Sequence, residues 1–78
     1  MKVLAIGAAG KMGKAVAAYF ASDPQVEVLG LLDAQPEGLE ALARAGGTAR
    51  MQLHPISIED VEELTRAMQQ YDVAVVTL

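Results

Sequence analysis

The chain has 78 residues, of which 53% are apolar and 21% charged, a balance typical of a folded globular domain. Ten acidic and six basic residues give a net charge of −4, and the basic residues are scattered, which argues against a nucleic-acid surface. The sequence has no cysteine, and none of its apolar stretches approaches the ~20 residues of a membrane span. We therefore expect one small cytoplasmic domain with no nucleic-acid partner, no membrane partner and no metal.

Four short apolar runs alternate with three segments of helical periodicity. This alternation is typical of strand-helix-strand units around a parallel sheet. The third run alternates polar and apolar residues and is predicted to be an edge strand, whereas the others are apolar on both faces. The four runs are Val3–Ile6, Val26–Leu32, Ala49–Leu53 and Val73–Leu78.

The first two predicted helices have clear limits. The first runs from about Lys11 to Ala21 and ends at Asp23-Pro24, because the residue before a proline avoids the helical conformation. The second begins near Pro36 and ends at Gly46-Gly47. Their inner faces are predicted to consist of Ala15, Val16, Tyr19 and Phe20 in the first helix, and of Leu39 and Leu42 in the second.

The third predicted helix opens at Ser57, whose hydroxyl is expected to cap the amide of Asp60. Acidic residues follow in its first turns, where they complement the helix dipole. Its inner stripe is predicted to be Ile58, Val61, Leu64 and Met68.

Right-handed crossovers between these parallel strands give the predicted fold class. It is α/β, a three-layer Rossmann-type half fold with a parallel sheet of four strands in the order 3-2-1-4 and three helices. We expect residues 1–78 to form the amino-terminal half of a dinucleotide-binding domain, with the substrate domain absent from the chain. The chain order reverses between the first and fourth strands, which is where ligands bind in such folds.

A glycine-rich turn, Gly7-Ala8-Ala9-Gly10-Lys11-Met12-Gly13, joins the first strand to the first helix. Gly7 permits a tight turn, Gly10 leaves room for a pyrophosphate, and Gly13 allows close packing of the helix on the sheet. The amides of Ala9 to Met12 are expected to be unpaired and to receive an anionic phosphate. The alternative is a sharp turn that binds no ligand.

Asp33 follows the second strand, 20 residues after Gly13, where a carboxylate that binds the adenosine ribose is expected. The alternative is an aspartate that only solvates the turn. No arginine stands next to Asp33 to neutralise a 2′-phosphate, so the predicted cofactor is NAD. NADP stays possible because Lys11, Arg44 or Arg50 can approach from elsewhere.

Two further residues are candidates for cofactor contact. His54 follows the third strand and either stacks on the adenine or is a loop residue without a role. Thr77, near the end of the fourth strand, either contacts the pyrophosphate or the nicotinamide ribose, or is simply a strand-favouring residue. The tyrosines, Tyr19 on the inner face of the first helix and Tyr71, are interpreted as packing residues. No catalytic residue is identified.

The glycine turn, together with Val26-Glu27-Val28-Leu29-Gly30-Leu31-Leu32-Asp33, resembles the amino terminus of saccharopine dehydrogenase-like oxidoreductases. Dihydrodipicolinate reductases share a similar glycine turn, but the segments 37–45 and 58–76 are more like the saccharopine dehydrogenase pattern. The resemblance implies hydride transfer with NAD or NADP in the parent protein. It also implies that the glycine turn holds the pyrophosphate and that Asp33 binds the adenosine ribose.

Three hypotheses remain open. The first is an NAD(P)-binding module that holds the adenosine diphosphate part of the cofactor and is not catalytic alone. The second is a subunit of an oligomeric dehydrogenase or reductase, completed by another chain in a homodimer through the edge Val73–Leu78. The third is a structural Rossmann-like scaffold without a ligand.

Overall fold

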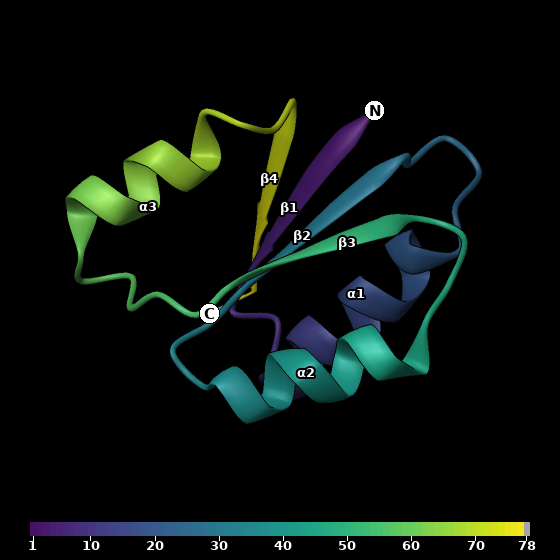
Figure 1. Cartoon of the computed structure of the whole chain (residues 1–78), viewed down its shortest axis with the longest axis horizontal. Coiled ribbons are helices and arrows are strands. Elements are labelled where there is room, and N and C mark those ends of the chain that lie inside the picture. The colour runs from purple at the N-terminus through teal and green to yellow at the C-terminus, as the bar shows by residue number, and fades with distance from the viewer. Residues whose placement is uncertain (78) are drawn as a thin grey trace.

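A computed structural model describes residues 1–77, which form four strands and three helices (Figure 1). The elements alternate along the chain as the sequence predicts. They are β1 (Lys2–Ile6), α1 (Lys11–Ala21), β2 (Val28–Leu32), α2 (Pro36–Ala45), β3 (Arg50–His54), α3 (Val61–Met68) and β4 (Val73–Val76).

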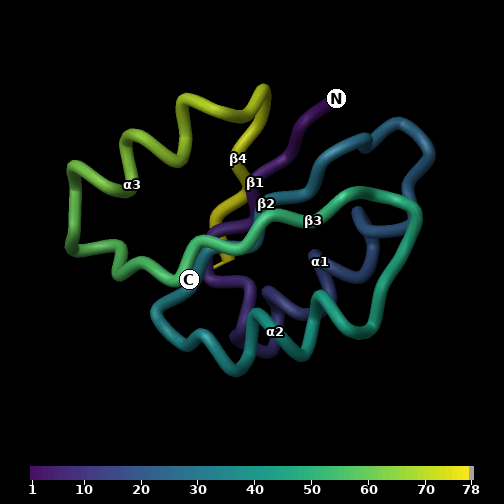
Figure 2. Tube along the Cα trace, viewed as in Figure 1, coloured from purple at the N-terminus to yellow at the C-terminus, as the bar shows by residue number. Residues whose placement is uncertain are grey.

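All strand pairs are parallel, and the sheet order is β3-β2-β1-β4. This confirms the predicted fold class and the predicted edge position of the third strand. Because the strands are parallel, the segments that follow β1, β2 and β3 leave the sheet at the same end, as the trace in Figure 2 shows. The order reverses between β1 and β4, so the glycine turn lies at the switch point of the sheet.

The helices divide between the two faces of the sheet (Figure 1). α1 and α2 cover one face, and α3 covers the other. The first core contains Val3, Leu29, Leu31 and Leu39, each 0% exposed, and the second is smaller and centres on Leu4, Ile6, Leu32 and Ala67. β1 and β2 are thus covered on both sides, which explains why their sequences are apolar at consecutive positions.

The inner face of α1 differs from the prediction. The buried residues are Gly13, Ala17 and Ala21, with Phe20 partly buried, whereas Tyr19 is 70% exposed. The prediction that Tyr19 faces inward was therefore wrong. The helix turns its smallest residues to the sheet because the close approach of its backbone at Gly13 leaves no room there for an aromatic ring.

The start and inner stripe of α3 also differ from the prediction. The helix begins at Val61, and the carboxylate of Asp60 accepts from the Glu63 amide at 3.3 Å, so Asp60 and not Ser57 is the cap. The Ser57 hydroxyl instead accepts from the Glu59 amide at 3.2 Å in a turn that precedes the helix. Residues Leu64 and Ala67 face the sheet, whereas the predicted inner residues Ile58, Val61 and Met68 are exposed.

Strand limits differ from the prediction by one or two residues. β2 begins at Val28 because the Val26 amide bonds to the Asp23 carbonyl in the preceding turn. Among residues 1–77, no helix is long and apolar enough to cross a membrane.

Candidate functional site

The glycine turn leaves β1 through a sharp bend fixed to the end of β2. Gly7 has a φ of 85°, a conformation that favours glycine, and the amides of Gly7 and Ala8 donate to the Leu32 carbonyl at 2.8 and 3.1 Å. A Cβ on Gly13 would collide with the Gly7 carbonyl and lie 2.8 Å from the Ala8 Cα. The first turn of α1 therefore rests directly on the bend, which is possible only without a side chain at Gly13.

Some amides of the turn have hydrogen-bond acceptors in the described part of the protein and others have none. The Ala9 amide donates to the Asp33 carboxylate at 3.0 Å, and the Gly10 amide donates to the Gly7 carbonyl at 3.1 Å. These two amides are therefore paired, contrary to the prediction. The amides of Lys11, Met12 and Gly13 have no acceptor within residues 1–77. The free donors thus begin at Lys11, two residues later than the sequence suggested.

Gly10 lies at the surface, just before these free donors. Its φ of −73° is accessible to any residue, and the nearest atom to an added Cβ is the Gly7 carbonyl oxygen at 3.5 Å, an ordinary contact. Packing within residues 1–77 therefore does not require a glycine here. A glycine at this position instead keeps the approach to the helix start clear.

Asp33 lies at the end of β2 and its half-buried carboxylate points toward the glycine turn. One oxygen accepts from the Ala9 amide, and the other accepts from the Gln35 amide at 3.1 Å. Each carboxylate oxygen can accept more than one bond, so this anchoring fixes the group while leaving acceptor capacity for a ligand.

A hollow of about 130 Å³ lies beside the turn at the carboxyl ends of the strands. It brings together the two motif residues Gly7 and Asp33 and adds the loop that follows β3. Sequence reasoning missed Ser57 and Ile58 as lining residues because their spacing suggested helix positions. The position of the loop after the edge strand is the signal that could have identified them. The lining residues are Gly7, Asp33, Ala34, Ser57 and Ile58.

His54 and Thr77 are both held by protein contacts. The His54 Nε2 lies 2.7 Å from the Tyr71 hydroxyl, and partial burial lowers the pKa of this imidazole from its ordinary value. The Thr77 hydroxyl donates to the carbonyls of Ile6 and Gly7 at 2.8 and 3.2 Å. Thr77 therefore ties the end of β4 to the start of the glycine turn.

The charge around the helix start favours an anion. Lys11 and Lys14 lie exposed in the first turn of α1, which contains no acidic residue. Cations are normally disfavoured at a helix N-terminus, because the dipole is positive there. A bound phosphate would offset both charges. Lys14 was not identified from the sequence because it follows the last glycine of the motif.

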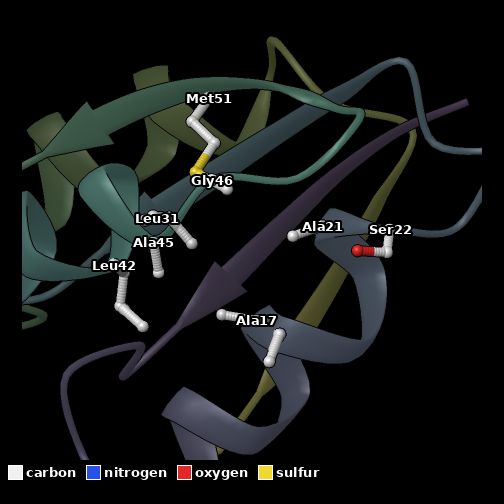
Figure 3. Close-up of a pocket in the computed structure, with 9 residues that line it drawn as sticks. Ala17, Ala21, Ser22, Leu31, Leu42, Ala45, Gly46 and Met51 are labelled. Carbon is white, nitrogen blue, oxygen red and sulfur yellow. The ribbon is translucent and has the colours of Figure 1, made fainter.

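A larger hollow of about 220 Å³ lies between α1, α2 and the face of the sheet that they cover (Figure 3). Its lining is apolar apart from the Ser22 hydroxyl and contains no charged residue. It therefore lacks the donors that a diphosphate needs. Its walls are formed by Ala17, Ala18, Ala21, Ser22, Leu31, Leu42, Ala45, Gly46 and Met51.

The described part of the chain, residues 1–77, contains no group of three or more side chains suited to hold a metal ion. The polar side chains that line the hollow beside the turn are those of Asp33 and Ser57, and the free amides of Lys11 to Gly13 lie at the helix start that follows the turn. This combination suits a ligand that has both an anionic group and hydroxyls.

The sheet order and the glycine turn at its switch point define a Rossmann-like nucleotide-binding fold. Residues 3–78 match the family model described as the saccharopine dehydrogenase NADP binding domain. The chain belongs to this family, which confirms the resemblance to saccharopine dehydrogenases. Comparisons with curated proteins and with solved structures gave no match. The protein is therefore a dinucleotide-binding module of an oxidoreductase family, with a nicotinamide dinucleotide as its class of cofactor.

Proposed function

We propose that the chain holds the adenosine diphosphate part of NAD or NADP and is not catalytic alone. The observation that carries this proposal is the set of free amides at Lys11, Met12 and Gly13, next to an unobstructed Gly10. Backbone donors at the positive end of a helix stabilise a pyrophosphate without any side chain. The lysines at positions 11 and 14 add attraction for the same anion.

We further propose that Asp33 binds the adenosine ribose. Its carboxylate is anchored at both oxygens beside the turn, so it is already oriented and loses little freedom when hydroxyls bind. A fixed negative charge at this position repels a 2′-phosphate, which favours NAD over NADP. The family description names NADP, so the relative affinity for the two cofactors is the informative measurement.

The remaining parts of the cofactor are assigned by position. The adenine is proposed to lie against Ile58 in the loop after β3, with His54 at the base of that loop. Thr77 lies across the switch point, on the side of the pyrophosphate and the nicotinamide ribose. When bound, the nicotinamide ring supplies hydride chemistry, and the residues of this chain bind and orient the other half of the molecule.

Titration of the isotopically labelled protein with ADP-ribose, NAD and NADP tests the proposal by NMR. The amides of Lys11 to Gly13 are expected to shift with all three, and NAD is expected to bind several-fold more tightly than NADP. Asp33→Asn, which keeps the shape but removes the charge, is expected to reduce that preference. Absence of shifts at the helix start with every ligand would reject the proposal.

The exposed strand β4 favours a second candidate function, a subunit completed by another chain. Val73 is 44% exposed and Val76 63%, and a bare apolar edge strand readily pairs with another strand. A homodimer through Val73–Leu78 extends the sheet; Leu78 lies outside the described residues. Sedimentation at increasing concentration tests this candidate, and a monomer throughout would contradict it.

A further inference from the structure

Tyr71 crosses the face of the sheet that α3 covers. The residue lies between α3 and β4, and its phenol occupies the space above Gly30 in the middle of β2. A Cβ on Gly30 would collide with the Tyr71 hydroxyl and ring, and would lie 2.8 Å from the Leu4 Cδ1. A glycine inside a strand weakens the strand, and it often marks a close approach by another group. Here Gly30 makes room for the tyrosine.

The phenol ends in two hydrogen bonds to β3. Its hydroxyl donates to the Gln52 Oε1 at 2.9 Å and lies 2.7 Å from the His54 Nε2. The rings of Tyr71 and His54 meet edge to face with centroids 5.7 Å apart. Because the phenol has one hydrogen and donates it to Gln52, the neutral His54 is expected to carry its proton on Nε2 and to donate it to Tyr71.

The backbone of His54 fixes the rim of the hollow beside the glycine turn. Its carbonyl accepts from the Asp33 amide at 3.2 Å and from the Ile56 amide at 2.9 Å. Asp33 lines the hollow, and Ser57 and Ile58 follow Ile56 directly. A side chain that holds His54 in place therefore holds both loops that form the adenosine side of the hollow.

We propose that Tyr71 is a positioning residue for the adenosine end of the dinucleotide and acts through His54. This inference rests on the proposed function. The glycine turn also has anchors that do not involve His54 or Asp33, namely the bonds of the Gly7 and Ala8 amides to the Leu32 carbonyl and of the Gly10 amide to the Gly7 carbonyl. Loss of the Tyr71 hydroxyl therefore weakens binding of the adenosine and ribose, and leaves binding of a bare diphosphate unchanged.

The substitution Tyr71→Phe tests the proposal. Tyr19→Phe is the matched control, because Tyr19 is 70% exposed and lies near the end of α1, away from the glycine turn. The dissociation constants for ADP-ribose and for inorganic pyrophosphate are measured by NMR titration. Tyr71→Phe is expected to weaken ADP-ribose binding about five- to tenfold, the effect of losing the one hydrogen bond that holds His54, and to leave pyrophosphate binding unchanged. The imidazole nitrogen shifts of His54 are expected to change as well, and Tyr19→Phe alters neither affinity.

A second variant, His54→Ala, keeps the phenol and removes its partner. It is expected to show the same selective loss of ADP-ribose affinity. The double variant is expected to lose no more affinity than either single variant, because all three variants lack the same hydrogen bond between Tyr71 and His54. An unchanged affinity for ADP-ribose, or an equal loss for both ligands, would overturn the positioning role. If the unmodified protein binds pyrophosphate but not ADP-ribose, the inference fails while the phosphate site stands. If it binds neither, the proposed function fails too.

Discussion

The two halves of the sheet differ in how completely they are covered. β1 and β2, with α1 and α2 over one face, contain residues that are 0% exposed, and the glycine turn and Asp33 are fixed to their ends. The α3 and β4 side has a smaller core and exposes Val61 by 68% and Val76 by 63%. The glycine turn and Asp33 of the proposed site are therefore built on the more completely buried half of the molecule, which is where a preorganised site needs to be.

The largest effect is expected at the contact between the turn and α1. Gly13→Ala places a Cβ against the Gly7 carbonyl and the Ala8 backbone, which cannot move as a flexible side chain can. The cost is expected to reach or exceed the roughly 1–3 kcal/mol typical of overpacking, a large share of the stability of a small domain. Urea denaturation measures the free energy of unfolding. Full native stability in this variant would show that the helix does not rest on the bend.

A smaller effect distinguishes the covered strand from the edge strand. Val3 and Val73 are register partners in β1 and β4, but Val3 is 0% exposed and Val73 is 44% exposed. Val3→Ala is expected to cost about 1.5–3 kcal/mol and Val73→Ala less than half as much, since burial determines the loss. Urea denaturation of both variants gives the difference. Equal costs would mean that β4 is covered in solution by another chain.

The smallest effect is a pH dependence on the α3 side. Burial lowers the pKa of His54 in the folded protein, so the unfolded chain binds more protons below its ordinary pKa of about 6.5. This contribution to stability is fully present above pH 6.5 and is lost as the pH falls toward and through the lowered folded pKa. Thermal melts between pH 5 and 8 measure it, with His54→Gln as control. If the variant and the unmodified protein show the same slope, His54 is not the source.

The strand order, the edge position of β3 and the glycine turn were predictable because they depend on local patterns. Continuous apolar runs indicate covered strands, and the distance from Gly13 to Asp33 is set by one helix and one strand. The residues that line the hollow were harder to predict from the sequence. Ser57 and Ile58 fit a helical spacing, and only the cap at Asp60 shows that they belong to a loop.

Burial on the α3 side was not predictable for a physical reason. Apolar residues at helical spacing indicate a face that can be buried, but they do not show whether a neighbour is there to cover it. Val61 and Met68 fit the period and remain exposed, while Ala67 is buried against the sheet with 2% of its surface exposed. Tyr19 was misplaced similarly, because the close approach at Gly13 selects small residues for the inner face of α1.

The central claim is that free backbone donors at the start of α1 receive a diphosphate across Gly10. Gly10→Ala tests it most directly, because an added Cβ meets no atom closer than 3.5 Å and requires no unusual backbone angle. We predict a variant with native stability, by urea denaturation, and with an affinity for ADP-ribose reduced at least tenfold, by NMR titration. A folded Gly10→Ala variant that binds ADP-ribose as tightly as the unmodified chain would contradict the claim.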